Sequence, residues 1–172
     1  MTLVIGGARS GKSVLAERLV LESGRVPVYL ATAEAHDDEM RARIAEHRRR
    51  RVGWQMVEAP RQLAGPLTAA APGSAVLLDC ATMWLSNVML AGADIAAEED
   101  RLMSALARCA APVVVVTNEV GLSIVPENKL ARAFRDAQGR LNQRLAAEAG
   151  LVVAVWAGLP LVLKGAMPAG AA

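Results

Sequence analysis

The sequence contains very few aromatic residues. Phe, Trp and Tyr make up 3% of its 172 residues, which counts against a surface that stacks successive nucleic-acid bases. The charges are nearly balanced, with 19 basic and 17 acidic residues, and a net charge of +2 does not indicate a polyanion-binding protein. We therefore expect no nucleic-acid partner.

Cysteine and histidine are also scarce. Cys80 and Cys109 are too few for a disulfide framework or a four-thiolate metal site. Each lies in an apolar stretch, so we expect both to be small core residues. His36 and His47 have no Cys/His cluster near them, and the sequence therefore does not indicate zinc.

No apolar run is long enough to span a bilayer. The longest uncharged C-terminal run, 149–163, is too short and contains Pro160. The N-terminal residues show neither the basic region nor the cleavage site of a signal peptide. We expect a cytoplasmic protein with no membrane span, and a frayed Ala/Gly-rich tail after Lys164.

Short apolar runs alternate with longer amphipathic stretches along the chain. This alternation predicts an α/β fold with a mostly parallel sheet and helices on both faces. Strands are expected at about 2–6, 27–31, 75–79, 112–117 and 151–156, with weaker ones at 54–58 and 161–163. Helices are expected at about 12–23, 37–51, 60–70, 82–91, 95–109 and 127–149. Pro126 and Glu127 are expected to open the last helix.

Residues 6–13, GGARSGKS, fit the pattern G-x-x-x-x-G-K-[ST] between an expected strand and an expected helix, as in a phosphate-binding P-loop. In such a loop, backbone N–H groups and the helix N-terminus surround an anion. Lys12 is the expected catalytic residue at the β- and γ-phosphates, and the Ser13 hydroxyl is an expected Mg²⁺ ligand. The nucleotide-binding residues expected here are Gly6, Gly7, Ala8, Arg9, Ser10, Gly11, Lys12 and Ser13. We expect residues 1–172 to form a single P-loop nucleotide-binding domain.

Asp79 ends the apolar run 75–79, which has the form of a Walker B strand. The carboxylate of such a strand holds the magnesium ion, directly or through water. The alternative is a strand-end aspartate that caps the next helix. Residues 117–120 read TNEV instead of the guanine-binding Asn-Lys-x-Asp, which counts against a signalling GTPase.

Residues 37–51 read DDEMRARIAEHRRRR, and His47 continues the apolar face of the helix expected there. One interpretation is a solvated basic helix with the histidine at the edge of the core. The other is a nucleophile that attacks phosphorus, or a general base, kept neutral by arginines that also hold phosphate oxygens. The residues alone leave both open. His36 is expected to be a surface or capping residue.

Four segments together resemble the bifunctional adenosylcobinamide kinase / adenosylcobinamide-phosphate guanylyltransferase family: GGARSGKS, DDEMRARIAEHR, LLDCATMWLSN and TNEVGLSIVPENKLARAFRDAQGRLNQRLA. The resemblance extends from residue 2 to about 164. It implies phosphorylation of adenosylcobinamide with GTP or ATP. It also implies transfer of GMP from GTP to the product, through a GMP–histidine intermediate, giving adenosylcobinamide-GDP and pyrophosphate. A RecA-like P-loop NTPase fold, Mg²⁺ and a homotrimer are expected with it.

The resemblance assigns the nucleophilic histidine to His47. It places further nucleotide contacts at Thr32, Ala33, Glu34, Arg48, Arg49, Arg50, Arg51, Glu58 and Asp79. Asn118 and Glu119 lie at the end of an expected strand, where we hypothesise that the corrinoid approaches.

Three other functions fit parts of the pattern. A RecA-like P-loop ATPase would use an acid such as Glu119 to polarise water and would not need His47. A small-molecule kinase would have only one of the two activities. A non-catalytic regulator would use P-loop occupancy to order the arginine-rich helix.

Overall fold

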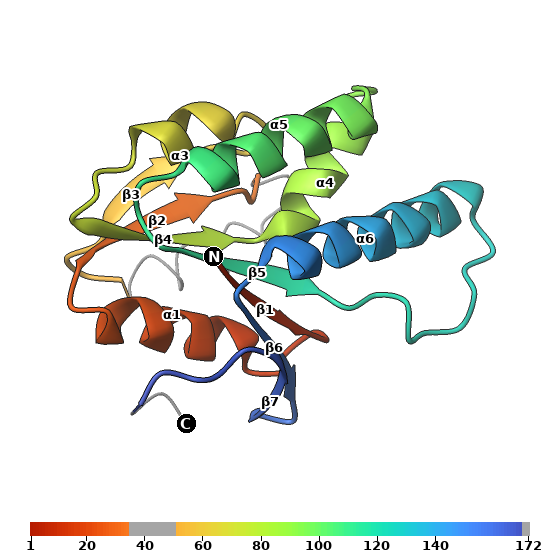
Figure 1. Ribbon diagram of the computed structural model, residues 1–172. Helices are drawn as coiled ribbons and strands as arrows, with labels where there is room; N and C mark the ends of the chain where they lie inside the picture. The colour runs from red at the N-terminus through yellow and green to blue at the C-terminus, as the bar shows by residue number, and fades with distance from the viewer. Residues whose placement is uncertain (35–50, 170–172) are drawn as a thin grey trace.

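The computed structural model describes residues 1–34 and 51–169 (Figure 1). Its elements, in chain order, are β1 (Thr2–Gly6), α1 (Lys12–Glu22), β2 (Val26–Ala31), β3 (Gln55–Glu58), α3 (Ala64–Ala69), β4 (Ser74–Asp79), α4 (Ala81–Leu90), α5 (Ile95–Arg108), β5 (Val113–Asn118), α6 (Lys129–Glu148), β6 (Leu151–Trp156) and β7 (Leu159–Lys164). The helix expected at 37–51 lies outside the described residues, except for Arg51, which is not helical.

The strands form one sheet in the order β3-β2-β4-β5-β1-β6-β7. Every neighbouring pair is parallel except β6 and β7, which form an antiparallel hairpin at one edge. The P-loop strand β1 therefore lies between β5 and β6. The expected mostly parallel α/β sheet is confirmed.

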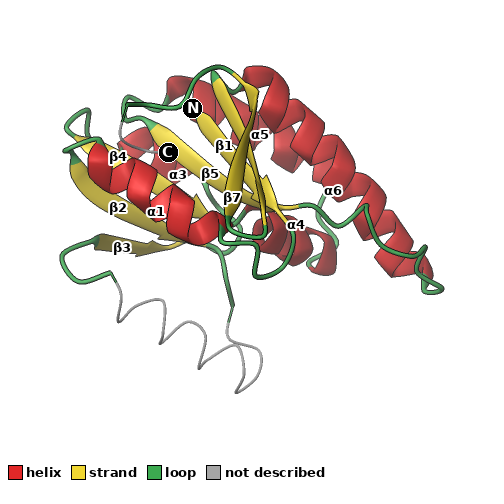
Figure 2. Ribbon diagram, turned by 90° about the horizontal axis from the view of Figure 1, so that it is seen from below, coloured by secondary structure: helices red, strands yellow, loops and turns green. Residues whose placement is uncertain are grey.

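Helices cover both faces of this sheet, as Figures 1 and 2 show. Helix α1 packs on one face, where Leu15 and Leu19 join a core with Val4 and Leu77. Helices α3, α4, α5 and α6 cover the opposite face in a second core. The inner strands are apolar on both sides because both faces are buried, which explains the uninterrupted apolar runs in the sequence.

Two expected helix boundaries are wrong for reasons that involve side-chain contacts. The helix expected from residue 60 begins at Ala64, because side chains of α4 engage the preceding carbonyls: Asn87 donates to Pro60 O at 3.0 Å and Trp84 to Arg61 O at 2.8 Å. Pro126 and Glu127 do not open α6. Its N-cap is Asn128, whose side chain accepts hydrogen bonds from the N–H groups of residues 130 and 131.

The cysteines and the C-terminal residues add to the packing. Cys80 is buried in the α1-side core, as expected, and half-buried Cys109 packs against the core on the other face. Met167, beyond β7, packs against the α1-side core. Among the described helices, none combines the length and apolar character needed to cross a membrane.

Candidate active site

The P-loop joins β1 to α1 and turns tightly around its own backbone. Gly11, the N-cap of α1, has φ 95°, a conformation that favours glycine. Gly6 is equally constrained, since a Cβ atom there would lie 2.6 Å from the carbonyl oxygen of Val155. The Lys12 ammonium donates to Gly7 O at 3.0 Å. The lysine is therefore folded back over the loop, where it can reach phosphates cradled by the backbone.

The turn of the β6–β7 hairpin supports the P-loop from outside. Gly158 N–H donates to Ser10 O at 2.9 Å. The Cβ position of Gly11 lies 3.3 Å from Gly158 Cα, so the two backbones pack closely. Gly158 was not among the expected site residues, since its turn, Ala157-Gly158, lacks the Asn-Gly or Asp-Gly pair that marks a two-residue hairpin turn most clearly.

The carboxyl ends of the parallel strands align the candidate residues along one edge of the sheet. Ala31 is the register partner of both Glu58 and Asp79, and Gly6 is opposite Asn118. Asp79 on β4 and Glu58 on β3 therefore lie on opposite sides of Ala31, two strand spacings from each other. At about 4.8 Å per strand, their backbones are roughly 10 Å apart.

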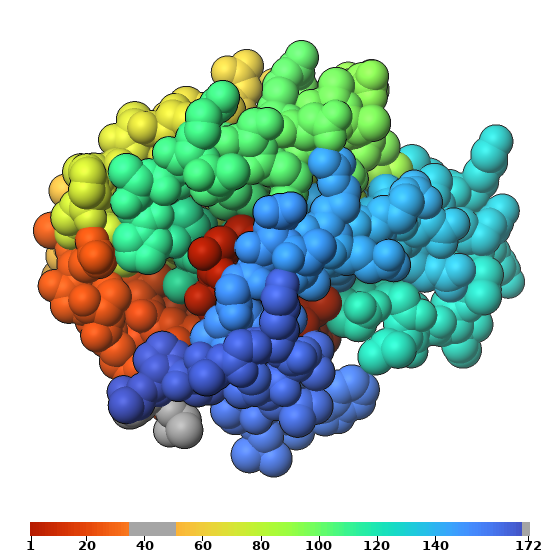
Figure 3. All heavy atoms as spheres, viewed as in Figure 1, coloured from red at the N-terminus to blue at the C-terminus, as the bar shows by residue number. Residues whose placement is uncertain are grey.

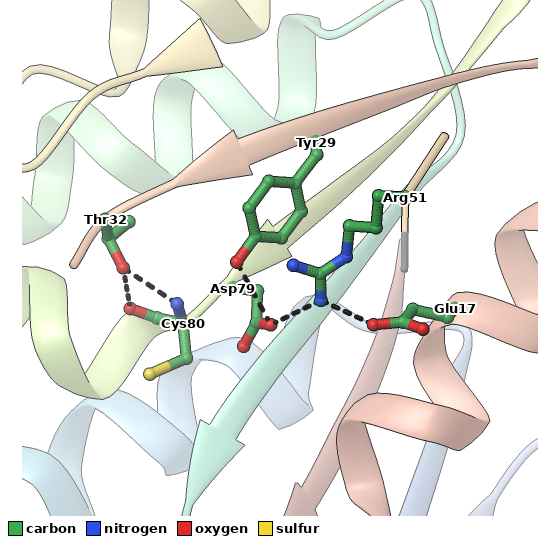
Figure 4. A network of polar contacts seen from close by, with 6 residues as sticks. All are labelled: Glu17, Tyr29, Thr32, Arg51, Asp79 and Cys80. Carbon is green, nitrogen blue, oxygen red and sulfur yellow. Dashed lines mark hydrogen bonds and ion pairs between the residues drawn. The ribbon is translucent and has the colours of Figure 1, made fainter. Parts of the chain in front are cut away.

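Arg51 lies in a buried ionic cluster beside this edge (Figure 4). One terminal nitrogen, Nη2, is 2.5 Å from Glu17 Oε1 and 3.1 Å from Asp79 Oδ2. The guanidinium stacks over the Tyr29 ring, 3.7 Å from its centroid. Among the described residues, Nε and Nη1 of Arg51 have no hydrogen-bond partner. Both nitrogens are buried, so an anion could reach them only if neighbouring atoms moved aside.

Burial and the surrounding charges shift three pKa values in this region. Burial lowers the pKa of Lys12 below its usual value, and Cys80 and the Asp79 carboxylate partly oppose that shift. Burial, with the Asp79 charge, raises the pKa of Tyr29. The same two causes raise the pKa of Cys80 to about 11, so Cys80 is a neutral thiol at pH 7 and not an activated nucleophile.

Thr32 follows β2 and is fully buried. Its hydroxyl donates to Cys80 O at 2.8 Å and accepts from Cys80 N–H at 2.7 Å. Asn87 also donates to Thr32 O. These contacts hold the backbone at the end of β2 against the end of β4. Ala33 and Glu34 follow directly and are half-buried.

A buried polar network fixes the end of β5. Thr117 Oγ1 donates to Asn142 Oδ1 at 2.7 Å and accepts from Gln138 Nε2 at 3.0 Å. Thr82 accepts from the N–H of Asn118, whose carbonyl accepts from Asn142. Residues of α4 and α6 thereby hold the strand end. None of these residues was expected at the site, since no local pattern pairs residues this far apart.

An open cavity of about 440 Å³ lies where β5 ends next to the P-loop. It is lined by Ala8, Asn118, Glu119, Val120, Leu122 and Ser123. Figure 3 shows the teal atoms of the loop after β5 beneath the cyan and blue atoms of α6, with a gap open to solvent between this loop and the blue atoms of the C-terminal hairpin. Asn118 and Glu119, our candidates near an acceptor, therefore share a cavity with a P-loop residue.

Comparison with known proteins identifies the family. Residues 2–163 match the family described as cobinamide kinase / cobinamide phosphate guanyltransferase. The chain belongs to this family. It is 44% identical over 167 residues to the bifunctional adenosylcobalamin biosynthesis protein CobP of Pseudomonas aeruginosa, covering 95% of this chain and 96% of that protein. It is 46% identical over 181 residues to the protein CobU of Salmonella typhimurium, covering 95% and 99%.

Among solved structures, the RadB recombinase is similar with a TM-score of 0.45 and 16% identity, over 89% of this chain and 72% of that one. The family resemblance seen in the sequence is confirmed by the matches to CobP and CobU, which cover 95% of this chain.

Several family residues expected at the site lie outside the described residues. These are His47, Arg48, Arg49 and Arg50. His36, expected to be a surface or capping residue, also lies outside the described residues. Of the remaining candidates, the structure brings Lys12, Thr32, Arg51 and Asp79 together. Glu58 lies farther along the same edge of the sheet.

We predict that Arg51 stabilises the fold by pairing with Glu17 and Asp79. Its side chain is fully buried, and those of Glu17 and Asp79 are 17% and 10% exposed. Arg51→Met removes the guanidinium that pairs with both carboxylates and should lower the free energy of unfolding by about 3 kcal/mol. Chemical denaturation measures this change. The control is Arg101→Met, whose 64% exposed side chain pairs with Glu98 and should cost less than about 1 kcal/mol. Equal effects of the two variants would contradict the buried-anchor role.

Proposed function

We propose that this protein phosphorylates adenosylcobinamide with GTP or ATP and then transfers GMP from GTP to the adenosylcobinamide phosphate. The products of the second step are adenosylcobinamide-GDP and pyrophosphate. The observation that carries the proposal is the match to the bifunctional proteins CobP and CobU at 44% and 46% identity over 95% of the chain. The assembled P-loop supports the use of a nucleoside triphosphate.

In the kinase step, residues 6–13 hold the triphosphate. The backbone N–H groups and the α1 N-terminus surround the phosphates, and Lys12 exchanges its contact with Gly7 O for β- and γ-phosphate oxygens. Ser13 and Asp79 suit Mg²⁺, which prefers oxygen ligands and usually binds through one or two protein groups plus phosphates. The described residues contain no group of three His, Cys, Asp or Glu side chains that could hold a metal. A magnesium site completed by phosphate oxygens does not require such a group. Magnesium, when bound, would neutralise phosphate charge.

In the guanylylation step, we assign His47 the role of nucleophile. Kinase chemistry needs attack at the γ-phosphorus and guanylylation needs attack at the α-phosphorus, and a single nucleotide pose hardly presents both in line. A covalent GMP–His47 intermediate divides the second task into two displacements. Attack by the imidazole nitrogen releases pyrophosphate, and the phosphate of the acceptor then displaces the histidine.

The anchors on either side of residues 35–50 support this role of His47. Thr32 is bonded to the backbone of Cys80, and Arg51 is paired with Asp79. The two anchors therefore contact consecutive residues, Cys80 and Asp79, at the end of β4. His47 is only four positions from the returning anchor, Arg51.

Other side chains complete the proposed nucleotide site. Arg51 contributes positive charge beside Asp79, and Arg48, Arg49 and Arg50, which precede it in the sequence, would hold phosphate oxygens. Thr32, Ala33 and Glu34 would contribute from the end of β2, and Glu58 from the end of β3.

The cavity beside the P-loop supports a place for the corrinoid acceptor. Its lining combines polar Asn118, Glu119 and Ser123 with apolar Val120 and Leu122. Ile124 and Val125 continue the apolar surface of this loop and are 94% and 60% exposed. Such a surface suits a large ligand with both apolar and amide-bearing faces.

We propose that the protein is a cytoplasmic homotrimer. Exposed apolar residues at the β7 edge support an oligomer, since Trp156, Leu159 and Leu161 are 70%, 71% and 61% exposed. Covering them in an assembly would remove apolar surface from water.

The test is to incubate the purified protein with adenosylcobinamide, Mg²⁺ and GTP, and to identify the corrinoid products by mass spectrometry. We expect adenosylcobinamide phosphate followed by adenosylcobinamide-GDP. The phosphorylated product alone would leave a single-activity kinase, and nucleotide hydrolysis with unchanged corrinoid would favour an ATPase-type function. Either result would contradict the bifunctional proposal.

A further inference from the structure

The geometry at the end of β5 points to Glu119 as the catalytic base of the phosphorylation step. This inference rests on the proposed function and adds a residue role to it. Glu119 lines the cavity beside the P-loop together with Ala8. It is half-buried in the connection that follows the strand adjacent to β1. A carboxylate there faces the space in which an acceptor hydroxyl must approach the γ-phosphate.

The position of Glu119 relative to the P-loop is fixed by the backbone. Its N–H donates to Gly6 O at 3.1 Å, which extends the pairing of β1 and β5 into the first residue of the P-loop. Directly before it, the network of Thr117, Gln138 and Asn142 anchors the strand to α6. The base and the phosphate cradle are therefore parts of one rigid unit, as in-line transfer requires.

The carboxylate itself is oriented by its own loop. Glu119 Oε1 accepts a hydrogen bond from Gly121 N–H at 2.6 Å. The other oxygen, Oε2, accepts no hydrogen bond from any residue within 1–34 or 51–169. A Cβ on Gly121 would lie 2.8 Å from Oε1, so the glycine permits this arrangement. One oxygen is thus held in place while the other remains able to take a proton.

Asp79 is less suited to this task. Its Oδ2 accepts from Arg51 at 3.1 Å, and its charge acts on Lys12. Asp79, at the end of β4, is therefore committed to Arg51 and Lys12, whereas Glu119, directly after β5, has no cationic partner among the described residues.

The proposed step moves one proton and one phosphoryl group. As the hydroxyl oxygen of the acceptor forms its bond to the γ-phosphorus, its proton passes to Glu119 Oε2. The bond between the γ-phosphorus and the β–γ bridging oxygen breaks, and its electron pair leaves with the nucleoside diphosphate. The guanylylation step needs no such base, because the acceptor there is already a phosphate anion.

The decisive variant is therefore Glu119→Gln. Its amide oxygen can still accept from Gly121 N–H, but it cannot take a proton. We expect kcat for adenosylcobinamide phosphorylation to fall by about 10²- to 10⁴-fold. GMP transfer to adenosylcobinamide phosphate, supplied ready-made, should stay within about threefold of wild type.

Two further variants separate base catalysis from loop structure. Glu127→Gln makes the same chemical change at an exposed position of the same loop, outside the cavity, and should leave both activities unchanged. Gly121→Ala displaces the Glu119 carboxylate and should lower the kinase rate without slowing GMP transfer.

The results distinguish the inference from the proposed function. A kinase rate in Glu119→Gln near that of wild type would overturn the role of Glu119. Equal losses of both activities, with a raised KM for the corrinoid, would also overturn it and make Glu119 an acceptor-binding residue. Failure of the wild-type protein to phosphorylate adenosylcobinamide would instead overturn the proposed function and the role that rests on it.

Discussion

Replacing His47 with alanine is expected to abolish GMP transfer while the protein still binds GTP. The imidazole is the proposed acceptor of the GMP group, whereas the P-loop holds the triphosphate independently. Loss of a covalent nucleophile should reduce GMP transfer by on the order of 10³-fold or more. The measurement uses GTP labelled at the α-phosphorus, followed by denaturation and detection of protein-bound label. A phosphoramidate should resist base and be released by acid.

The matched control is His36→Ala, which removes the only other histidine of the sequence. This variant should retain the label and GMP transfer. Label that persists in His47→Ala would show that another residue is the nucleophile. No label in a folded, GTP-binding wild-type protein would favour the alternative in which His47 lies at the edge of the core.

Replacing Lys12 with alanine should impair both activities together. Its ammonium is positioned over the P-loop by Gly7 O, and it is the cation expected at the β- and γ-phosphates. Loss of one such transition-state contact is expected to cost about 10²- to 10³-fold in each reaction. Separate assays of phosphorylation and GMP transfer, with a nucleotide-binding measurement, would test this.

Lys129→Ala provides the control, since Lys129 is exposed at the start of α6 and remote in sequence from the P-loop. It should leave both activities near those of wild type. If Lys12→Ala lost only one activity, the model of a single triphosphate site serving both reactions would be wrong.

The sequence was most informative where the chemistry is local. The P-loop is eight consecutive residues between a strand and a helix, and each inner strand is a short apolar run. Asp79 was identifiable because it ends such a run. These features need no knowledge of distant residues, and the structure places them as expected at the carboxyl edge of the sheet.

Features that depend on distant side chains could not be predicted. The run of arginines ending at Arg51 suggested phosphate binding, but the ion pair of Arg51 with Glu17 joins residues far apart in the sequence. The same holds for Gln138 and Asn142, which looked like ordinary polar residues of a long helix and instead secure the end of β5. Periodicity identifies a buried face but not the partner on the other side of it.

The support that Gly158 gives to Ser10 has a consequence for the order in which the protein acquires its function. The P-loop is translated before the segments that support it, since β1 pairs with strands that begin at residues 113 and 151, and the loop itself is braced by residue 158. A nascent chain therefore cannot complete its phosphate cradle until residue 158 has left the ribosome. Nucleotide binding at this cradle can stabilise the fold only after that point.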